Sequence, residues 1–155
     1  MIDLSGKNAL VTGAAVGIGR GVSKVLAEQG ANVVVSDIDL DGAKSTSDEI
    51  VSSGGSSLFA QLDVTNKDSV QTLLTGLSNR LGQIDIVVNN AGVVGAHGWW
   101  ERKIPNDDDW DTVLAINLRG VVNVSLAVEK EMKERKQGKI INIASIASRQ
   151  GSPSI

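Results

Sequence analysis

The stretch "VTGAAVGIGRG", residues 11–21, contains four glycines and separates an apolar run from a helix-like sequence. Each glycine in a regular element costs about 0.5–1 kcal/mol relative to alanine, so a dense group of them suggests a backbone that side chains would obstruct. A flexible loop is the alternative interpretation. The position between a strand and an amphipathic helix favours a turn that binds a ligand.

The segments on either side of this turn predict a strand, a helix and a second strand. Residues 8–13 ("NALVTG") read as a short buried strand. The spacing of the next apolar residues predicts a helix that Gly30 ends. The residues expected to face the sheet are Ile18, Val22, Val25 and Leu26. Residues 31–37 ("ANVVVSD") then predict a strand buried on both faces, because its valines are consecutive.

The same alternation continues to the end of the chain. Residues 39–55 predict a weaker helix, and residues 56–64 a third strand. Thr65 and Asp68 resemble a capping box for a helix with Val70, Leu73, Leu74, Leu77 and Leu81 on one face. A fourth strand (83–92), a long helix (107–136) and a fifth strand (138–145) follow. The sequence therefore predicts an α/β fold: one doubly wound, Rossmann-like parallel sheet of order 3-2-1-4-5, as a single domain over residues 1–155.

Composition narrows the class of protein. The 155 residues are 41% hydrophobic and 21% charged, as expected for a globular domain, and the net charge of −3 argues against nucleic acid as a partner. There is no cysteine, so neither disulfides nor a thiolate metal site is expected, and no metal is predicted. No apolar run approaches the roughly 20 residues of a membrane span. We expect a cytoplasmic protein without membrane contact.

Ligands of doubly wound sheets bind beyond the carboxyl ends of the strands, where the strand order reverses. The glycine turn lies at that point. Gly13 would form the tight turn after the first strand, Gly17 would let the backbone approach a pyrophosphate, and Gly19 would let the helix pack closely. The turn is therefore predicted to bind a dinucleotide.

An acidic residue at the end of the second strand completes the dinucleotide signal. The carboxylate of Asp37 can accept hydrogen bonds from both ribose hydroxyls of NAD. A 2′-phosphate at about 4 Å would be repelled by up to roughly 4 kcal/mol at an effective dielectric near 20, so NAD is predicted over NADP. Alternatively, Asp37 is a solvated turn residue, or Asp39 or Asp41 shares its role.

Several short motifs resemble the short-chain dehydrogenase/reductase family in the family's order along the chain. They are "TGAAVGIG" (12–19), "LDV" (62–64), "NNAG" (89–92), Asn117 in "INLRG" and "IINIAS" (140–145). The resemblance covers essentially the whole chain. It implies an oxidoreductase that moves a hydride between a nicotinamide cofactor and a secondary alcohol or ketone, in a parent protein that forms homo-oligomers.

The resemblance also assigns roles to individual positions. Ser145 would hydrogen-bond the substrate oxygen, and Asn117 would hold a water of the proton relay; a buried amide bonded to the backbone is the alternative for Asn117. The cofactor-binding residues implied are Gly13, Val16, Ile18 and Gly19 at the pyrophosphate, Asp37 at the ribose, Asp63 and Val64 at the adenine, and Asn90, Ala91 and Gly92 near the nicotinamide.

One part of the family pattern is missing. A YxxxK motif is expected near position 158, beyond Ile155, and the sequence contains no tyrosine. We therefore expect a fragment that lacks the C-terminal strands and helices, is inactive alone and exposes an apolar face. A dinucleotide-binding module without catalysis is the alternative function. His97 is expected to be a surface loop residue, while Trp99 and Trp100 either line a substrate pocket or cover the following helix.

Overall fold

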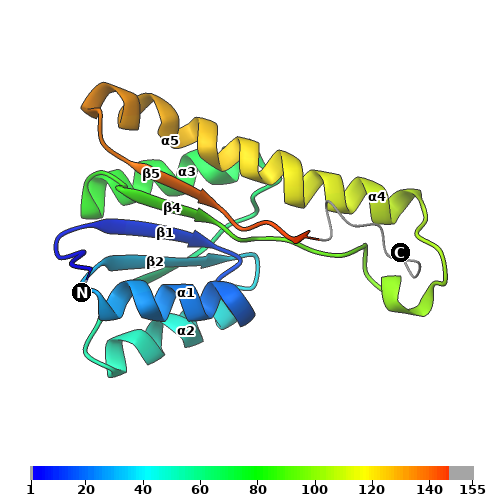
Figure 1. The fold of residues 1–155 in the computed structure, drawn as a ribbon, viewed down its shortest axis with the longest axis horizontal. Coiled ribbons are helices and arrows are strands. Elements are labelled where there is room, and N and C mark those ends of the chain that lie inside the picture. The colour runs from blue at the N-terminus through cyan, green and yellow to red at the C-terminus, as the bar shows by residue number, and fades with distance from the viewer. Residues whose placement is uncertain (1, 147–155) are drawn as a thin grey trace.

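The computed structural model describes residues 2–146 and contains one parallel sheet of five strands (Figure 1). The strand order is β3-β2-β1-β4-β5, as the sequence predicts. The strands are β1 (Asn8–Thr12), β2 (Asn32–Asp37), β3 (Ser56–Gln61), β4 (Ile86–Asn89) and β5 (Lys139–Asn142). The order reverses between β1 and β4, so the carboxyl ends of these two strands define where a ligand binds in this class of fold.

Helices cover the sheet on both faces. One face carries α1 (Gly17–Glu28) and α2 (Leu40–Ser52). The other carries α3 (Lys67–Leu81) and a continuous helical stretch made of α4 (Asp107–Val113), a π-helical segment η2 (Leu114–Gly120) and α5 (Val121–Arg135) (Figure 1). A short 3₁₀ turn, η1 (Trp99–Glu101), precedes α4.

The central strands are buried on both sides. Val33 and Val35 of β2 pack toward α1 and α2, whereas Val34 packs toward α3 and α5. All three are at most 1% exposed. The prediction that the consecutive valines form a strand buried on both faces is therefore confirmed.

The predicted sheet-facing side of α1 is wrong in part. Ile18 and Val25 are 66% and 55% exposed. The helix instead lies on the sheet through its small residues Gly19, Ser23 and Ala27, with Val22 and Leu26 beside them. Close approach of α1 to the glycine turn leaves room only for small side chains there, so the apolar spacing alone gave the wrong face.

The start of α3 also differs from the expectation. Asn66, rather than Thr65, caps the helix, and its side chain accepts hydrogen bonds from the backbone N–H groups of Asp68 and Ser69. Thr65 donates instead to Asp63. The third strand ends at Gln61, three residues before the predicted end, because the chain turns at Asp63 to reach this cap.

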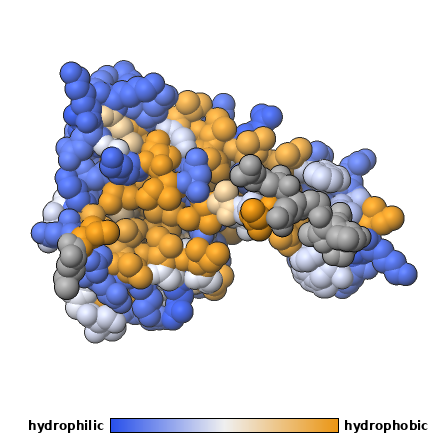
Figure 2. Space-filling view, viewed as in Figure 1, coloured by the Kyte–Doolittle hydropathy of each residue, from blue (hydrophilic) through white to orange (hydrophobic). Residues whose placement is uncertain are grey.

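The last strand forms one edge of the sheet and is exposed. Ile140, Ile141 and Ile143 are 38–45% exposed, in keeping with the exposed apolar face that the sequence predicts. Figure 2 shows a broad hydrophobic area across the middle of the molecule in the region of β5 and α5. The edge strand and the outer side of the long helical stretch thus carry much of the exposed apolar surface of the described residues.

The long helical stretch Asp107–Arg135 has the length and the apolar composition of a membrane span, with a mean hydropathy of 1.3 over its best 18-residue window. This is weak evidence for a membrane, since core helices pass the same test. Val124, Val128 and Met132 of this stretch pack on the sheet.

Candidate functional site

The glycine turn between β1 and α1 is tightly packed at two of its glycines. Gly13 has a φ of +62°, and a Cβ there would lie 2.6 Å from the Cα of Ala91. A Cβ on Gly19 would lie 2.5 Å from Asn90 Nδ2 and would overlap the carbonyl oxygen of Gly13. By contrast, a Cβ on Gly17, whose φ is +60°, would meet nothing within 4 Å. Gly17 therefore faces open space.

The first turn of α1 has no side chain to satisfy its N–H groups. Its N-cap is Val16, an exposed apolar residue, and it has no acidic residue in the first turn. Within residues 2–146, α2, α3 and α4 are capped by Asp39, Asn66 and Asn106. The positive end of the α1 dipole and its N–H donors are therefore available to an anion next to Gly17.

Asp37 lies at the end of β2 beside this turn. Its Oδ2 accepts a hydrogen bond of 3.0 Å from the backbone N–H of Ala15, and its Oδ1 accepts one of 3.1 Å from Asp39. These contacts fix the half-buried carboxylate next to the glycine turn. Asp39 is engaged elsewhere, since its side chain accepts from Gly42 at the start of α2.

The ends of β1 and β4 are joined by a small hydrogen-bond network. Asn90 Nδ2 donates to the carbonyl oxygens of Thr12 and Gly13 at 3.0 and 2.8 Å. The hydroxyl of Thr12 accepts from the N–H groups of Asn90 and Ala91, both at 3.0 Å. The structure thus brings Asn90 and Ala91 to the glycine turn. Thr12 was missed as a supporting residue, although a hydroxyl at the end of a buried apolar strand was its sequence signal.

Asn117 holds the chain directly after the NNAG motif. Its Oδ1 accepts from the N–H of Val93 at 2.9 Å, and its Nδ2 donates to the carbonyl of Val93 at 2.8 Å. A Cβ on Gly92 would lie 3.3 Å from Asn117 Oδ1. The amide is bonded to the backbone, as the alternative interpretation held, but it lies in an exposed π-helical segment rather than in the core. Its role in holding a water stays a prediction.

Ser145 lies in the segment that follows β5. Strand β5 pairs with β4 through Asn142 and Asn89, and the N–H of Ile143 donates to the carbonyl of Asn89 at 2.9 Å. The chain to Ser145 therefore leaves the sheet at the same edge as the NNAG segment, with both running toward the α4 end of the molecule in Figure 1. Ser145 itself is exposed.

Asp63 and Val64 follow the carboxyl end of β3, the outer strand on the β2 side of the sheet. Asp63 Oδ1 accepts from the N–H and the hydroxyl of Thr65 at 2.9 and 2.7 Å. Val64 is 7% exposed, and its carbonyl accepts from the buried amide of Asn123 in α5. Both residues are held firmly, but no described hydrogen bond joins them to the glycine turn, so their contact with an adenine stays a prediction.

An ion pair between half-buried Arg102 and buried Asp109 fixes the loop between β4 and α4. Arg102 donates from Nε and Nη2 to the two carboxylate oxygens of Asp109 at 2.9 and 2.6 Å. Asp109 also accepts from the backbone of Ala96 and Asn106, and it is 3% exposed. The hydrogen bonds from Arg102 and Asn106 lower the pKa of Asp109 from 3.8 to about 2. Sequence analysis missed this pair, because nothing in the sequence distinguishes Asp109 from the neighbouring aspartates.

This pKa shift predicts an acid-sensitive loop. A carboxylate with a lowered folded-state pKa stabilises the fold above its ordinary value of 3.8, and that contribution is lost as the pH falls toward about 2. We expect the melting temperature to fall between pH 5 and pH 2 more steeply in the native protein than in Asp109→Asn. Calorimetry at several pH values measures this slope. Asp107→Asn, an exposed aspartate of the same turn, should keep the native slope; equal slopes for native protein and Asp109→Asn would contradict the assignment.

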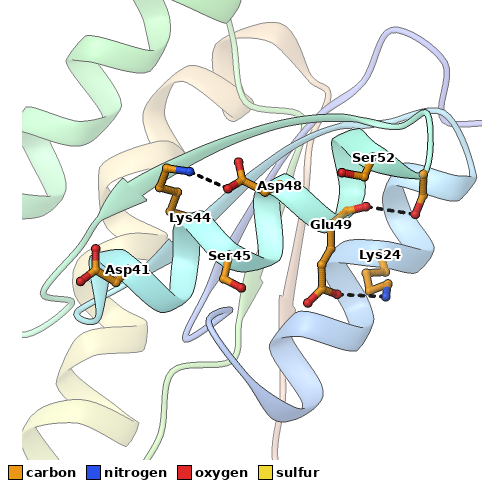
Figure 3. A pocket seen from close by; sticks show the side chains of 8 residues that line it. Lys24, Asp41, Lys44, Ser45, Asp48, Glu49 and Ser52 are labelled. Atoms are coloured by element: carbon orange, nitrogen blue, oxygen red, sulfur yellow. Dashed lines mark hydrogen bonds and ion pairs between the residues drawn. The ribbon is translucent and has the colours of Figure 1, made fainter.

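A surface groove between α1 and α2 does not coincide with the predicted site. It has a volume of about 580 Å³. Figure 3 shows Lys44 paired with Asp48 and Lys24 paired with Glu49 along it. Asp41, an alternative ribose contact in the sequence analysis, lines it, whereas Asp37 and the other predicted cofactor and catalytic residues do not. Within the described residues, no group of histidine, cysteine, aspartate or glutamate side chains could hold a metal ion.

Comparisons with known proteins add an independent line of evidence. A family model described as short chain dehydrogenase matches residues 7–155. A 5-keto-D-gluconate 5-reductase of Escherichia coli is 36% identical over 155 residues, which are 100% of this chain and 60% of that protein. The chain thus spans about 60% of the length of such relatives.

Two solved structures superpose closely on the chain. A gluconate 5-dehydrogenase from Burkholderia cenocepacia, in complex with NADP and tartrate, has a TM-score of 0.87 and 36% identity, covering 99% of this chain and 59% of that one. A metagenomic short-chain oxidoreductase in complex with NADP has a TM-score of 0.86 and 34% identity, covering 96% and 66%.

Proposed function

Because the chain belongs to the short-chain dehydrogenase family, we propose that it is the dinucleotide-binding part of an NAD-dependent oxidoreductase acting on a secondary alcohol or ketone. The observation that carries this proposal is the glycine turn before an uncapped helix α1, with the Asp37 carboxylate fixed beside it. When bound, the nicotinamide supplies or accepts the hydride. The residues around the glycine turn and after β4 and β5 would bind and orient the two reactants.

The donor set fits a dinucleotide. Gly17 faces open space at the start of α1, where the N–H groups of Gly17, Ile18 and Gly19 have no side-chain cap, so a pyrophosphate would be held by the backbone. The Asp37 carboxylate would accept from the adenosine ribose. Asp63 and Val64 would hold the adenine, and Asn90, Ala91 and Gly92 the part near the nicotinamide.

The choice of NAD over NADP depends on Asp37. The two solved structures reported above contain NADP. In this chain, however, a carboxylate lies at the end of β2 with its orientation fixed by Ala15 and Asp39, and it would repel a 2′-phosphate. No arginine or lysine occupies positions 14–16 to offset that repulsion. We therefore propose that NAD is the preferred cofactor.

On the substrate side, Ser145 would orient the carbonyl or alcohol oxygen, and Asn117 would help to pass the proton. A serine hydroxyl is a poor acid near neutrality, and the sequence contains no tyrosine to take that role. Loss of a general acid typically costs 10²- to 10⁴-fold in rate. We therefore expect the 155-residue chain to bind the dinucleotide but to turn over slowly or not at all, which is also what a non-catalytic binding module would do.

Fluorescence titration tests the cofactor proposal directly. We expect NADH to bind the chain at least tenfold more tightly than NADPH does. Equal or stronger binding of NADPH would exclude the NAD preference, and the absence of binding by both would exclude a dinucleotide site. NADH consumption in the presence of a panel of ketones would establish the oxidoreductase, because turnover requires one. A chain that binds NADH without consuming it fits both functional classes, since the sequence contains no tyrosine to act as the acid.

We also propose that the protein is cytoplasmic, contacts neither nucleic acid nor membrane, and associates with itself. An exposed apolar row follows the outer side of the long helical stretch at four-residue spacing: Trp110, Leu114, Leu118, Val122 and Leu126, each 44–61% exposed. Residues at this spacing form a ridge that packs into the groove of a second helix. A second copy of the chain supplies such a helix.

Substituting one residue of this row should weaken self-association. We expect Leu126→Glu to shift the protein from a concentration-dependent oligomer toward a single chain, because it places a charge in a buried apolar contact. Sedimentation velocity at several concentrations measures the shift. Lys130→Glu, a position one turn later whose side chain is 88% exposed, is the matched control and should change little. A native protein that is monomeric at all concentrations would exclude the proposal.

A further inference from the structure

The loop between β4 and α4 is fixed at two points to the helix that follows it. Asn117 binds both polar backbone groups of Val93, and Asp109 accepts from the N–H of Ala96. These two side chains lie eight residues apart, about two helical turns. The beginning of the loop is thus aligned along the α4–η2 stretch rather than projecting freely into solvent.

The Arg102–Asp109 ion pair closes the loop on itself. Arg102 lies six residues after Ala96, yet both interact with the same carboxylate. Gly95 fits inside this closed segment, since a Cβ there would lie 2.8 Å from Asp109 Oδ1 and 2.5 Å from Trp99 Cβ. Gly98 has a φ of +76°, which few other residues adopt. The segment between Gly95 and Arg102 is therefore a built turn with one defined shape.

This turn presents an aromatic cluster to solvent. The rings of His97 and Trp100 meet edge to face with centroids 5.4 Å apart, and those of Trp99 and Trp100 do so at 6.4 Å. Trp99 and Trp100 remain 42% and 59% exposed. Two large rings held in fixed orientations at low entropic cost are suited to contact another ring or an apolar group.

The charge around the cluster favours a neutral ligand. Five carboxylates lie between Glu101 and Asp111, against the two cations Arg102 and Lys103. Asp107, Asp108 and Asp111 are exposed. An anionic group brought to this end of the molecule would be repelled, whereas a neutral apolar ring would not.

The position of the cluster connects it with the candidate site. Gly92, near the start of the loop, lies beside Asn117, and the chain to Ser145 leaves the sheet at the carboxyl ends of the same strands. We propose that Arg102 and Asp109 position the segment Gly95–Glu101 as one wall of the substrate site, a proposal that rests on the function proposed above. Trp99 and Trp100 on this wall select neutral ketones or alcohols that carry an aromatic ring.

Ligand binding to variants of the full chain tests this proposal. Acetophenone serves as the neutral aromatic probe and D-gluconate as the anionic, non-aromatic one, with dissociation constants from saturation-transfer NMR, with and without NADH. We expect acetophenone to bind at least tenfold more tightly than gluconate. Trp100→Ala and Arg102→Gln should each weaken acetophenone binding by at least tenfold, with NADH binding changed by less than twofold.

Matched controls separate this role from a general loss of structure. Ile104→Ala removes an exposed apolar side chain of the same loop, and Lys103→Gln removes a neighbouring exposed cation. Both should leave acetophenone binding within twofold. Acrylamide quenching of tryptophan fluorescence should increase in Arg102→Gln and not in Lys103→Gln, because all three tryptophans lie at positions 99–110.

The outcomes distinguish this proposal from the proposed function. Failure of NADH to bind the native chain contradicts the dinucleotide function. In that case the acetophenone titration carried out in the absence of NADH still tests the aromatic wall. Gluconate binding as tightly as acetophenone, or equal losses in Trp100→Ala and Ile104→Ala, would overturn the wall. An unchanged acetophenone affinity in Arg102→Gln would overturn the positioning role of the ion pair.

Discussion

Replacing Gly19 by alanine is expected to abolish measurable NADH binding and to lower the free energy of unfolding by about 1–3 kcal/mol. The added Cβ would lie 2.5 Å from Asn90 Nδ2 and 2.9 Å from the Cα of Ala14, and it would overlap the carbonyl of Gly13. Most of these neighbours are backbone atoms of the turn itself. The clash can be relieved only by moving α1 away from β1, which displaces the N–H groups that would hold a pyrophosphate.

Gly21 provides the matched control on the same helix. A Cβ there would meet nothing within 4 Å, so Gly21→Ala should stabilise the protein by up to about 1 kcal/mol through helix propensity and leave NADH binding intact. Chemical denaturation and NADH titration of the two variants give both numbers. Unchanged NADH affinity in Gly19→Ala would show that the dinucleotide binds elsewhere.

Replacing Asp37 by asparagine is expected to reverse the cofactor preference. Asparagine keeps one oxygen that can accept from the N–H of Ala15, which holds the carboxamide beside the glycine turn. Its NH2 group replaces the oxygen that accepts from the N–H of Asp39, so that hydrogen bond is lost. Removing the charge eliminates the repulsion of a 2′-phosphate and weakens the charge-assisted bonds to the ribose. We expect NADPH affinity to rise at least tenfold and NADH affinity to fall by a similar factor, measured by fluorescence titration.

Neighbouring aspartates show whether the effect belongs to Asp37. Asp41→Asn, an exposed position in the first turn of α2, should change neither affinity by more than twofold. Asp39→Asn tests the alternative that the neighbour shares the role; its side chain caps α2 through Gly42, so we expect a small loss of stability and no change in preference. A reversal in Asp39→Asn but not in Asp37→Asn would move the ribose contact to Asp39.

The sheet and its order follow from local signals in the sequence. Consecutive valines in β2, a glycine turn after β1 and alternating helices leave few other topologies, since right-handed crossovers restrict the choice. The face of α1 could not be predicted, because the close approach of Gly19 to Gly13 depends on contacts between segments rather than on helical spacing. The cap of α3 was misplaced by one residue for a similar reason, since Thr65 is engaged by Asp63.

The parts of the candidate site that carry sequence motifs could be predicted, whereas the contacts that only the fold brings together could not. The positions of Asp37 and Asn90 beside the glycine turn follow from strand ends meeting at one sheet edge. The Arg102–Asp109 pair was not foreseen, because several aspartates precede and follow Asp109 and only the fold shows which of them is buried. Its pairing with a loop arginine is a tertiary contact without a sequence pattern.

The network around Thr12 has a consequence for how a ligand would be received. One hydroxyl and one carboxamide join the peptide chain after β1 to the chain after β4, so the two segments cannot shift independently. Both segments therefore lose most of their conformational entropy when the protein folds, and little more when a ligand binds. A molecule bridging them should encounter a rigid receptor, with association limited by diffusion and orientation rather than by rearrangement of the protein.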